Sequence, residues 1–238
     1  MTRILSILFI SIQLTGFSSC QKKPEQTAQT ATVQTVKVPD TLMILTLERT
    51  IYPLEKTVSM PWAVRLSDVL ADIGKPISIV RSFYEFIPEN LADSLISLHP
   101  AVVVIDFGLM ESWVNTTNQN DDSALPLTEF RNRLHQLSKT FSARGIYVIL
   151  LTPNPLGEAY EKWRSDRLEM YAATIRDLAN QFSLALVDVE GSFGQYASIP
   201  GNQLSDLLIE GKYPNDIGQA IIAEDVGVSI AYQLYPGK

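Results

Sequence analysis

The sequence predicts an α/β fold of three layers, a doubly wound, five-stranded parallel sheet with helices on both faces. Short apolar runs alternate along residues 41–238 with longer segments whose apolar residues recur at helical spacing. The strongest run, residues 101–108 (AVVVIDFG), is apolar on both faces except at Asp106. Such a run is typical of a strand buried in a parallel sheet, and the alternating order predicts one domain.

Each predicted strand is a short apolar run bounded by polar or turn-forming residues. The predicted strands are residues 42–48, 76–81, 101–108, 146–153 and 184–190. The predicted helices are residues 62–73, 88–98, 127–145, 158–182 and 214–235. Gly74 should end the first helix and Pro88 should begin the second. The polar segment 111–126 is predicted to be a long loop.

Residues 1–20 have the pattern of an export signal. Arg3 precedes an apolar run at residues 4–14, which is shorter than the roughly 20 residues that a membrane-spanning helix needs. Ser18 and Ser19 come directly before Cys20, although Phe17 stands where leucine is usual, and the stretch resembles a bacterial lipoprotein signal. The resemblance implies that Cys20 is lipidated and anchors the protein in the bacterial cell envelope. Gln21 after the cysteine favours the outer membrane where the organism has one.

Residues 21–40 are rich in Gln, Thr and Lys, and we expect them to form a flexible tether to the folded domain, residues 41–238. Cys20 is the only cysteine, which excludes a disulfide within the chain and a thiolate metal site. The formal net charge is −7, and Lys22-Lys23 is the only basic run, so a nucleic-acid partner is not expected. We also expect no metal and no cofactor, and the oligomeric state stays open.

Charged and polar residues follow the predicted strands. The carboxyl ends of parallel strands meet at one edge of a sheet, where ligands bind. The residues predicted at this edge are Glu48, Arg49, Arg81, Ser82, Met110, Glu111 and, after a further loop, Glu210, Lys212 and Tyr213.

Three stretches of the sequence together have the pattern of a known family. They are VVVIDFGLME (102–111), ILLTPNP (149–155) and LLIEGKYPNDIGQAIIAE (207–224). These stretches resemble the SGNH, or GDSL-type, hydrolase family. The third is the most specific, because it is similar to the closing D-G-x-H-P-N-x-x-G stretch of that family. The family comprises esterases, lipases and carbohydrate deacetylases on a flavodoxin-like sheet, and the resemblance covers nearly all of residues 41–238.

The resemblance also implies which residues stand at the catalytic positions. Glu48 aligns with the nucleophilic serine, and Ser82 lies near the oxyanion-hole glycine. Met110 aligns with the asparagine that donates to the oxyanion, and Glu111 takes the place of the aspartate after it. At the closing stretch, Glu210 replaces aspartate and Tyr213 replaces the histidine base.

These replacements remove the parts that ester hydrolysis needs. A serine hydroxyl is a weak nucleophile without an adjacent base, and a tyrosine phenol, with a pKa of about 10, is a neutral donor at pH 7. Methionine cannot donate to an oxyanion, and losing one such donor costs about 10²–10³ in rate. The two histidines, His99 and His135, fall before the third strand and on helix 127–145, away from the edge. Ser59 could approach the site but has no evident histidine partner.

Three interpretations of the edge stay open. Its charged residues could form an ion-pair network, or they could line a polar cleft that holds a glycan or an envelope fragment. Alternatively, paired carboxylates could act on a glycoside or hold a divalent cation, although no metal-ligand spacing is evident. Trp113 and Tyr213 could stack on a sugar or simply pack a loop.

The main hypothesis is a non-catalytic binding or scaffolding module. The alternative is an esterase or carbohydrate deacetylase that acts on acylated envelope or extracellular substrates with a non-standard site.

Overall fold

The computed structural model of the chain describes residues 40–49 and 58–235. These described residues belong to one compact unit, residues 36–238. The predicted signal, Cys20 and all of the predicted tether before Asp40 lie outside the described residues. No helix in the described ranges is long and apolar enough to cross a membrane.

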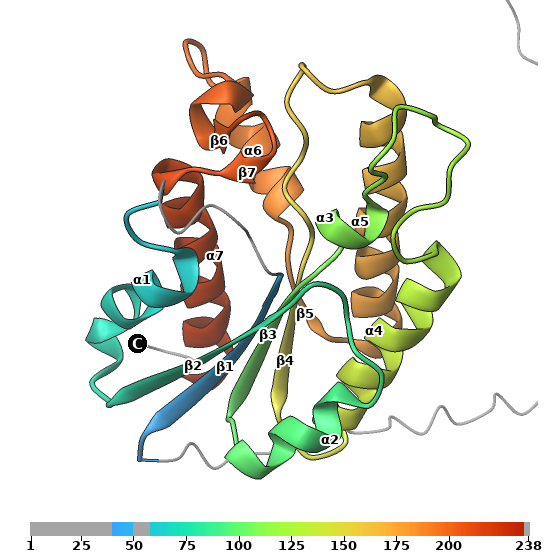
Figure 1. The fold of residues 1–238 in the computed structure, drawn as a ribbon. Helices are drawn as coiled ribbons and strands as arrows, with labels where there is room; N and C mark the ends of the chain where they lie inside the picture. Colours follow the sequence, from blue (N-terminus) through green and yellow to red (C-terminus); the bar gives the residue numbers. More distant parts are fainter. Residues whose placement is uncertain (1–39, 50–57, 236–238) are drawn as a thin grey trace, which may run out of the picture. The chain divides into compact units, whose positions relative to one another are not determined.

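A parallel sheet of five strands forms the centre of the domain, in the order β2-β1-β3-β4-β5 (Figure 1). The strands are β1 (Leu42–Arg49), β2 (Ile77–Tyr84), β3 (Val102–Asp106), β4 (Tyr147–Leu151) and β5 (Ala185–Val187). The predicted five-stranded parallel sheet is confirmed. The strand order reverses between β1 and β3, so their carboxyl ends frame the position where such sheets bind ligands.

The helices that cover the sheet are α1 (Trp62–Val69), α2 (Leu91–Leu95), α4 (Leu127–Ser142), α5 (Lys162–Phe182) and α7 (Asp216–Leu234). Two further helices, α3 (Leu109–Ser112) and α6 (Val189–Ser198), follow β3 and β5. Short 3₁₀ turns are η2 (Ala71–Ile73), η3 (Ile96–Leu98) and η4 (Leu204–Leu207). A small antiparallel pair, β6 (Leu208–Ile209) and β7 (Tyr213–Pro214), precedes α7.

Alternate residues of β1 face two separate hydrophobic cores. Ile44 packs with α1 and α7 on one face of the sheet, whereas Leu45 and Leu47 pack with α4 and α5 on the other. Figure 1 shows these helix pairs on opposite sides of the sheet. Burial of both faces explains why the strands are almost continuously apolar. The predicted three-layer, doubly wound architecture is therefore confirmed.

Two predicted strands have different ends in the structure. β2 continues to Tyr84 because Ser82, Phe83 and Tyr84 pair with the end of β1, and aromatic residues suit a pleated strand. Ser82 therefore lies inside β2 and not in a loop after it, as the sequence had suggested. β5 ends early at Val187, because the Asp188 carboxylate accepts a hydrogen bond from the backbone N–H of Gly191 and caps α6.

The segments next to the site also differ from prediction. The predicted loop 111–126 does not begin at residue 111, because Glu111 lies in α3. The closing helix starts at Asp216, two residues later than predicted, and Pro214 belongs to β7. The Asn215 side chain accepts hydrogen bonds from the backbone N–H groups of Ile217 (2.9 Å) and Gly218 (3.1 Å). This N-cap fixes where the helix begins.

Candidate functional site

Glu48 lies at the end of β1 and is held in an ion pair with Arg81 of β2. Its carboxylate accepts hydrogen bonds from Nε (2.8 Å) and Nη2 (2.7 Å) of Arg81 and from the Thr46 hydroxyl (2.6 Å). The register explains the pairing, because Thr46 lies opposite Arg81 in the sheet and Glu48 is two residues further on the same face. Glu48 is only 4% exposed, and its charge is matched by the partly exposed guanidinium of Arg81 through two hydrogen bonds.

Arg49, the last residue of β1, is a buried cation whose hydrogen bonds are incomplete. Its Nη2 donates to Oδ1 of Asn154 at 2.9 Å, and its Nη1 lies 3.8 Å from Oδ1 of Asp106. Neither Nε nor Nη1 has a hydrogen-bond partner among residues 40–49 and 58–235, and the residue is 3% exposed. Two buried donors of one guanidinium are thus unsatisfied in the described site.

Glu111 is fully buried in α3. Its Oε2 accepts a hydrogen bond of 2.7 Å from the backbone N–H of Gly108, while Oε1 has no partner in the described part of the chain. Burial raises the pKa of Glu111 from 4.5 to about 7, and the Gly108 hydrogen bond and the Arg49 charge oppose that rise. Gly108 has φ +123°, a conformation that favours glycine, which lets the chain turn from β3 into α3.

Lys212 presents its ammonium to aromatic rings instead of to a carboxylate. Its Nζ lies 3.2 Å from the ring centroid of Trp113 and 5.1 Å from that of Tyr213. Burial, followed by the charges of Arg49 and Arg164, lowers the pKa of Lys212 from 10.5 to about 8. Within the described ranges no carboxylate lies at ion-pair distance from it, and the residue is 6% exposed.

The turn that carries Lys212 is fixed by backbone contacts. Glu210 and Gly211 both have positive φ angles, +52° and +65°. The Gly157 backbone N–H donates to the Gly211 carbonyl at 2.7 Å, and the Tyr160 hydroxyl donates to the Glu210 carbonyl at 3.1 Å. The Asn154 side-chain amide donates to the Lys212 carbonyl at 2.8 Å. Asn154 therefore connects the turn with Arg49.

Trp113 is already engaged by its neighbours. Besides the Lys212 ammonium, the Arg164 guanidinium lies 4.7 Å from the ring centroid, and Tyr160 meets the ring edge-on at 5.6 Å. These contacts favour a packing role for Trp113 over stacking on a sugar. Trp113 instead holds the Lys212 side chain in place.

Tyr213 is half-buried in β7 and remains a protonated phenol at neutral pH. Burial raises its pKa above 10. The charge of Arg49 opposes this rise, while Tyr160 and Glu210 add to it. A phenol with a raised pKa is a hydrogen-bond donor and not a base at pH 7.

The structure brings some of the predicted edge residues together and separates others. Asn154 joins Arg49 to the backbone of Lys212, and the Lys212 ammonium lies over the Tyr213 ring. The charge of Arg49 also acts on the buried Glu111, and we call Arg49, Glu111, Lys212 and Tyr213 the Arg49 cluster. Glu48 and Arg81 form their own pair beside it. Glu210 is exposed and contributes its carbonyl, Met110 is half-buried in α3, and Ser82 lies within β2.

The remaining polar candidates take ordinary structural roles. The Ser59 hydroxyl donates to Asp216 at 2.8 Å. His99 is exposed, with Nδ1 2.8 Å from the Ser97 carbonyl, and the His135 ring stacks on Phe182 at 4.4 Å. No group of three or more metal-ligating side chains occurs in the part of the chain that the structure describes.

Sequence reasoning did not select Asn154 or Asp106 as site residues. Asn154 follows β4 in the stretch ILLTPNP, and Asp106 interrupts the apolar run of β3. A polar residue at the end of a buried strand was therefore the available signal. The partners of Asn154, Arg49 and Lys212, are far from it in sequence, and only the folded chain shows them.

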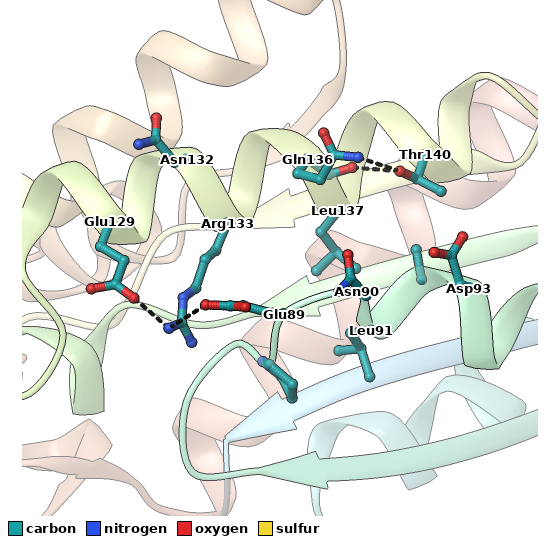
Figure 2. A pocket seen from close by; sticks show the side chains of 12 residues that line it. Glu89, Asn90, Leu91, Asp93, Glu129, Asn132, Arg133, Gln136, Leu137 and Thr140 are labelled. Carbon is teal, nitrogen blue, oxygen red and sulfur yellow. Dashed lines mark hydrogen bonds and ion pairs between the residues drawn. The ribbon is translucent and has the colours of Figure 1, made fainter.

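A separate cavity of about 280 Å³ lies between α2 and α4 (Figure 2). Its lining includes Glu89, Glu129 and Arg133 and none of the predicted edge residues. Arg133 forms ion pairs with both carboxylates and donates to the Ile87 carbonyl at 2.8 Å. Arg133 thus has both of these carboxylates as partners.

The sequence model of the GDSL-like Lipase/Acylhydrolase family matches residues 70–226. This chain belongs to that family. The match covers α3 and the closing stretch with Tyr213, and it begins after β1. A comparison with curated proteins gave no significant match. Placing Glu48, Met110 and Tyr213 at the catalytic positions of the GDSL family therefore remains a prediction from motif resemblance.

Solved structures that include two acetylxylan esterases share the fold of this GDSL-family domain. An acetyl xylan esterase, AlAXEase, is 18% identical with a TM-score of 0.65, over 79% of this chain and 100% of that one. Axe2, an acetylxylan esterase from Geobacillus stearothermophilus, is 16% identical with a TM-score of 0.64, over 85% and 100%. TesA is 19% identical with a TM-score of 0.58, over 79% and 97%. At these identities the similarity establishes the fold and not the reaction.

Proposed function

We propose that this GDSL-family domain has lost ester hydrolysis and serves as a binding module, anchored in the bacterial cell envelope through lipidated Cys20. The observation that carries the proposal is the Glu48–Arg81 ion pair at the end of β1. A carboxylate stands where the resemblance expects the nucleophilic serine, and a guanidinium neutralises it through two hydrogen bonds of 2.8 and 2.7 Å.

The other parts of the site support the same conclusion. Tyr213, which the resemblance aligns with the base, has a pKa raised above 10 by burial and stays protonated at neutral pH. His99 and His135 have partners elsewhere, so neither is available to activate a serine. Met110 has no polar hydrogen to offer to an oxyanion. Nucleophile, base and one oxyanion donor would all have to be replaced before an ester could be cleaved.

The test is an assay of the detergent-solubilised full chain with 4-nitrophenyl acetate. A variant with Glu210→Ala and Tyr213→Phe is the matched control. We expect both proteins to give the rate of buffer alone. Turnover by the native chain that the double variant lacks would refute the loss of hydrolysis and support the alternative, an esterase or carbohydrate deacetylase with a non-standard site.

A fluorophosphonate probe gives an independent test, because it labels only activated serines. We expect no labelling of the native chain under conditions in which an active serine esterase is labelled completely. Stoichiometric labelling of any serine, located by mass spectrometry, would identify a nucleophile and refute the proposal.

The proposed anchor is tested separately. The native chain made in a bacterial host should incorporate labelled palmitate and partition into the detergent phase of Triton X-114. The Cys20→Ser variant should do neither. Equal partitioning of the two proteins would refute anchoring through Cys20 without bearing on the binding role.

A further inference from the structure

The site contains cationic donors that no described carboxylate satisfies. We propose that the Arg49 cluster binds an acidic sugar, whose carboxylate lies between Arg49 and Lys212 and whose neighbouring hydroxyl meets Glu111. This inference rests on the proposed binding function and names the class of ligand.

Arg49 supplies the first part of the argument. A buried N–H group without an acceptor is costly, and a buried guanidinium with two such nitrogens is costlier still. Nε and Nη1 of Arg49 both lack acceptors in the described chain, and Asp106 lies beyond hydrogen-bond distance at 3.8 Å. A ligand oxygen would satisfy donors that the described part of the fold leaves open.

Lys212 supplies the second cation. Its ammonium is buried against Trp113 and Tyr213 and has no carboxylate partner in the described ranges. The aromatic faces hold the charge but give it no oxygen acceptor. Because Asn154 donates to the Lys212 carbonyl and accepts from Arg49, the two cations are fixed on one hydrogen-bonded unit.

The charges near this unit favour an anion. Glu48 is committed to Arg81, and the Arg164 guanidinium is committed to Glu161 at 2.8 Å. Arg49 lies beside Asp106, which is not hydrogen-bonded to it, and its charge acts on Glu111, whose pKa burial raises to about 7. Nε and Nη1 of Arg49 lack an acceptor in the described ranges, and the Lys212 ammonium has no carboxylate at ion-pair distance there, so a ligand carboxylate would supply the missing acceptor.

Glu111 decides between a simple anion and an acidic sugar. Its Oε1 is fully buried and has no partner in the described part of the chain. This oxygen can accept a hydrogen bond from a hydroxyl, or donate to one when it is protonated. A molecule with a carboxylate and an adjacent hydroxyl would offer acceptors to Arg49 and Lys212 and a hydroxyl to Glu111. Uronic acids have this arrangement, whereas inorganic phosphate and neutral sugars lack one of its two parts.

The experiment is a titration of the detergent-solubilised full chain with D-glucuronate, D-glucose and inorganic phosphate at equal ionic strength. Binding is followed by calorimetry and by the NMR signal of the Lys212 ammonium. We expect saturable binding of glucuronate, at least tenfold weaker binding of phosphate, no binding of glucose, and a shift of the Lys212 signal on saturation. Equal binding of glucuronate and glucose, or an unchanged Lys212 signal, would overturn the inference. Phosphate that binds as tightly as glucuronate would overturn the ligand class.

Variants complete the test. Lys212→Met should weaken glucuronate binding at least tenfold, while Lys139→Met, at an exposed lysine of α4, should leave it unchanged. Equal loss in both variants would refute the site. Since the Lys212 signal is measured on the native chain, the inference remains testable even if Lys212→Met fails to fold.

The outcome is separable from that of the proposed function. Ester hydrolysis together with glucuronate binding through Lys212 would refute the loss of catalysis and uphold the ligand class. Absence of both hydrolysis and glucuronate binding would leave the loss of hydrolysis supported and refute the ligand class alone.

Discussion

Glu48 and Arg81 form a bidentate ion pair across β1 and β2, with nitrogen–oxygen distances of 2.8 and 2.7 Å. The Glu48 side chain is 5% exposed and that of Arg81 is 27% exposed. The pair therefore joins the carboxyl-terminal parts of two neighbouring strands, with the carboxylate almost fully buried. This pair makes Glu48 a structural residue of the strand end, at the position where motif resemblance alone predicts a nucleophile.

The Glu48–Arg81 pair predicts that removing one partner destabilises the protein more than removing both. Arg81→Met leaves the Glu48 carboxylate buried without its partner, and we expect a loss of roughly 3–5 kcal/mol in the free energy of unfolding. Adding Glu48→Leu should recover most of that loss, because no uncompensated charge then remains. Urea denaturation of the native chain and both variants measures this. A loss below about 1 kcal/mol for Arg81→Met would show that the pair carries little stability.

A histidine at position 213 should not by itself give ester hydrolysis. Tyr213→His places an imidazole in the closing stretch, but Glu48 still provides no hydroxyl for it to activate. We expect no hydrolysis of 4-nitrophenyl acetate above background for Tyr213→His or for Glu48→Ser alone. The hydrolysis rate of the triple variant Glu48→Ser, Met110→Asn and Tyr213→His is the one to compare with the rates of these single variants. Turnover by Tyr213→His alone would show that a nucleophile exists elsewhere in the chain.

The start of α7 predicts a packing effect. A Cβ at Gly218 would lie 2.7 Å from the Leu207 carbonyl oxygen and 2.9 Å from the Phe193 ring, contacts that the backbone cannot easily relieve. Gly218→Ala should therefore destabilise the protein by about 1–3 kcal/mol.

Gly194 of α6 is the matched control, since a Cβ there meets no atom within 4 Å. Gly194→Ala should be neutral or stabilise the helix by up to about 1 kcal/mol. Thermal unfolding of the two variants distinguishes the effects, and equal stability of both would contradict the close approach of α7 to the 207 carbonyl.

The fold was predictable because apolar runs and helical spacing record burial directly. Residues 101–108 reveal a strand covered on both faces without any knowledge of its neighbours. Strand ends were less predictable, because Ser82 joins β2 only through pairing with Leu47 of β1. The same holds for β5, where the Asp188 cap starts a helix inside an apparently apolar run.

The sequence predicted which residues lie at the edge of the sheet, but not which of their side chains interact. The edge rule placed Arg49, Glu111 and Lys212 together. It gave no means of choosing Arg81 as the partner of Glu48 over the other cations, because that choice depends on strand register. The Arg49–Asn154 bond joins residues 105 positions apart, and the contact of Lys212 with Trp113 depends on how two loops pack. Such contacts follow from side-chain packing, which periodicity does not encode.

Glu111 predicts a pH dependence of stability. Its pKa is raised from 4.5 to about 7, so the folded state binds more protons than the unfolded state between those values. The stabilising contribution of the protonated carboxyl is complete below pH 4.5 and is lost as the pH rises through 7. From pH 5 to pH 7.5 this amounts to roughly 2 kcal/mol. The native chain should lose that much stability in urea denaturation, beyond the changes due to other groups.

Glu111→Gln isolates this effect from the other titrating groups. The amide oxygen can still accept the hydrogen bond from Gly108, but the side chain no longer ionises. Lys212, whose pKa is lowered to about 8, changes stability mainly between pH 8 and 10.5, above the range of the experiment. Burial also raises the pKa of Glu190, and this carboxyl contributes equally to both proteins. The difference in unfolding free energy between the native chain and Glu111→Gln should therefore shift by about 2 kcal/mol between pH 5 and 7.5. Parallel pH profiles would show that folding does not raise the pKa of Glu111 and would contradict this prediction.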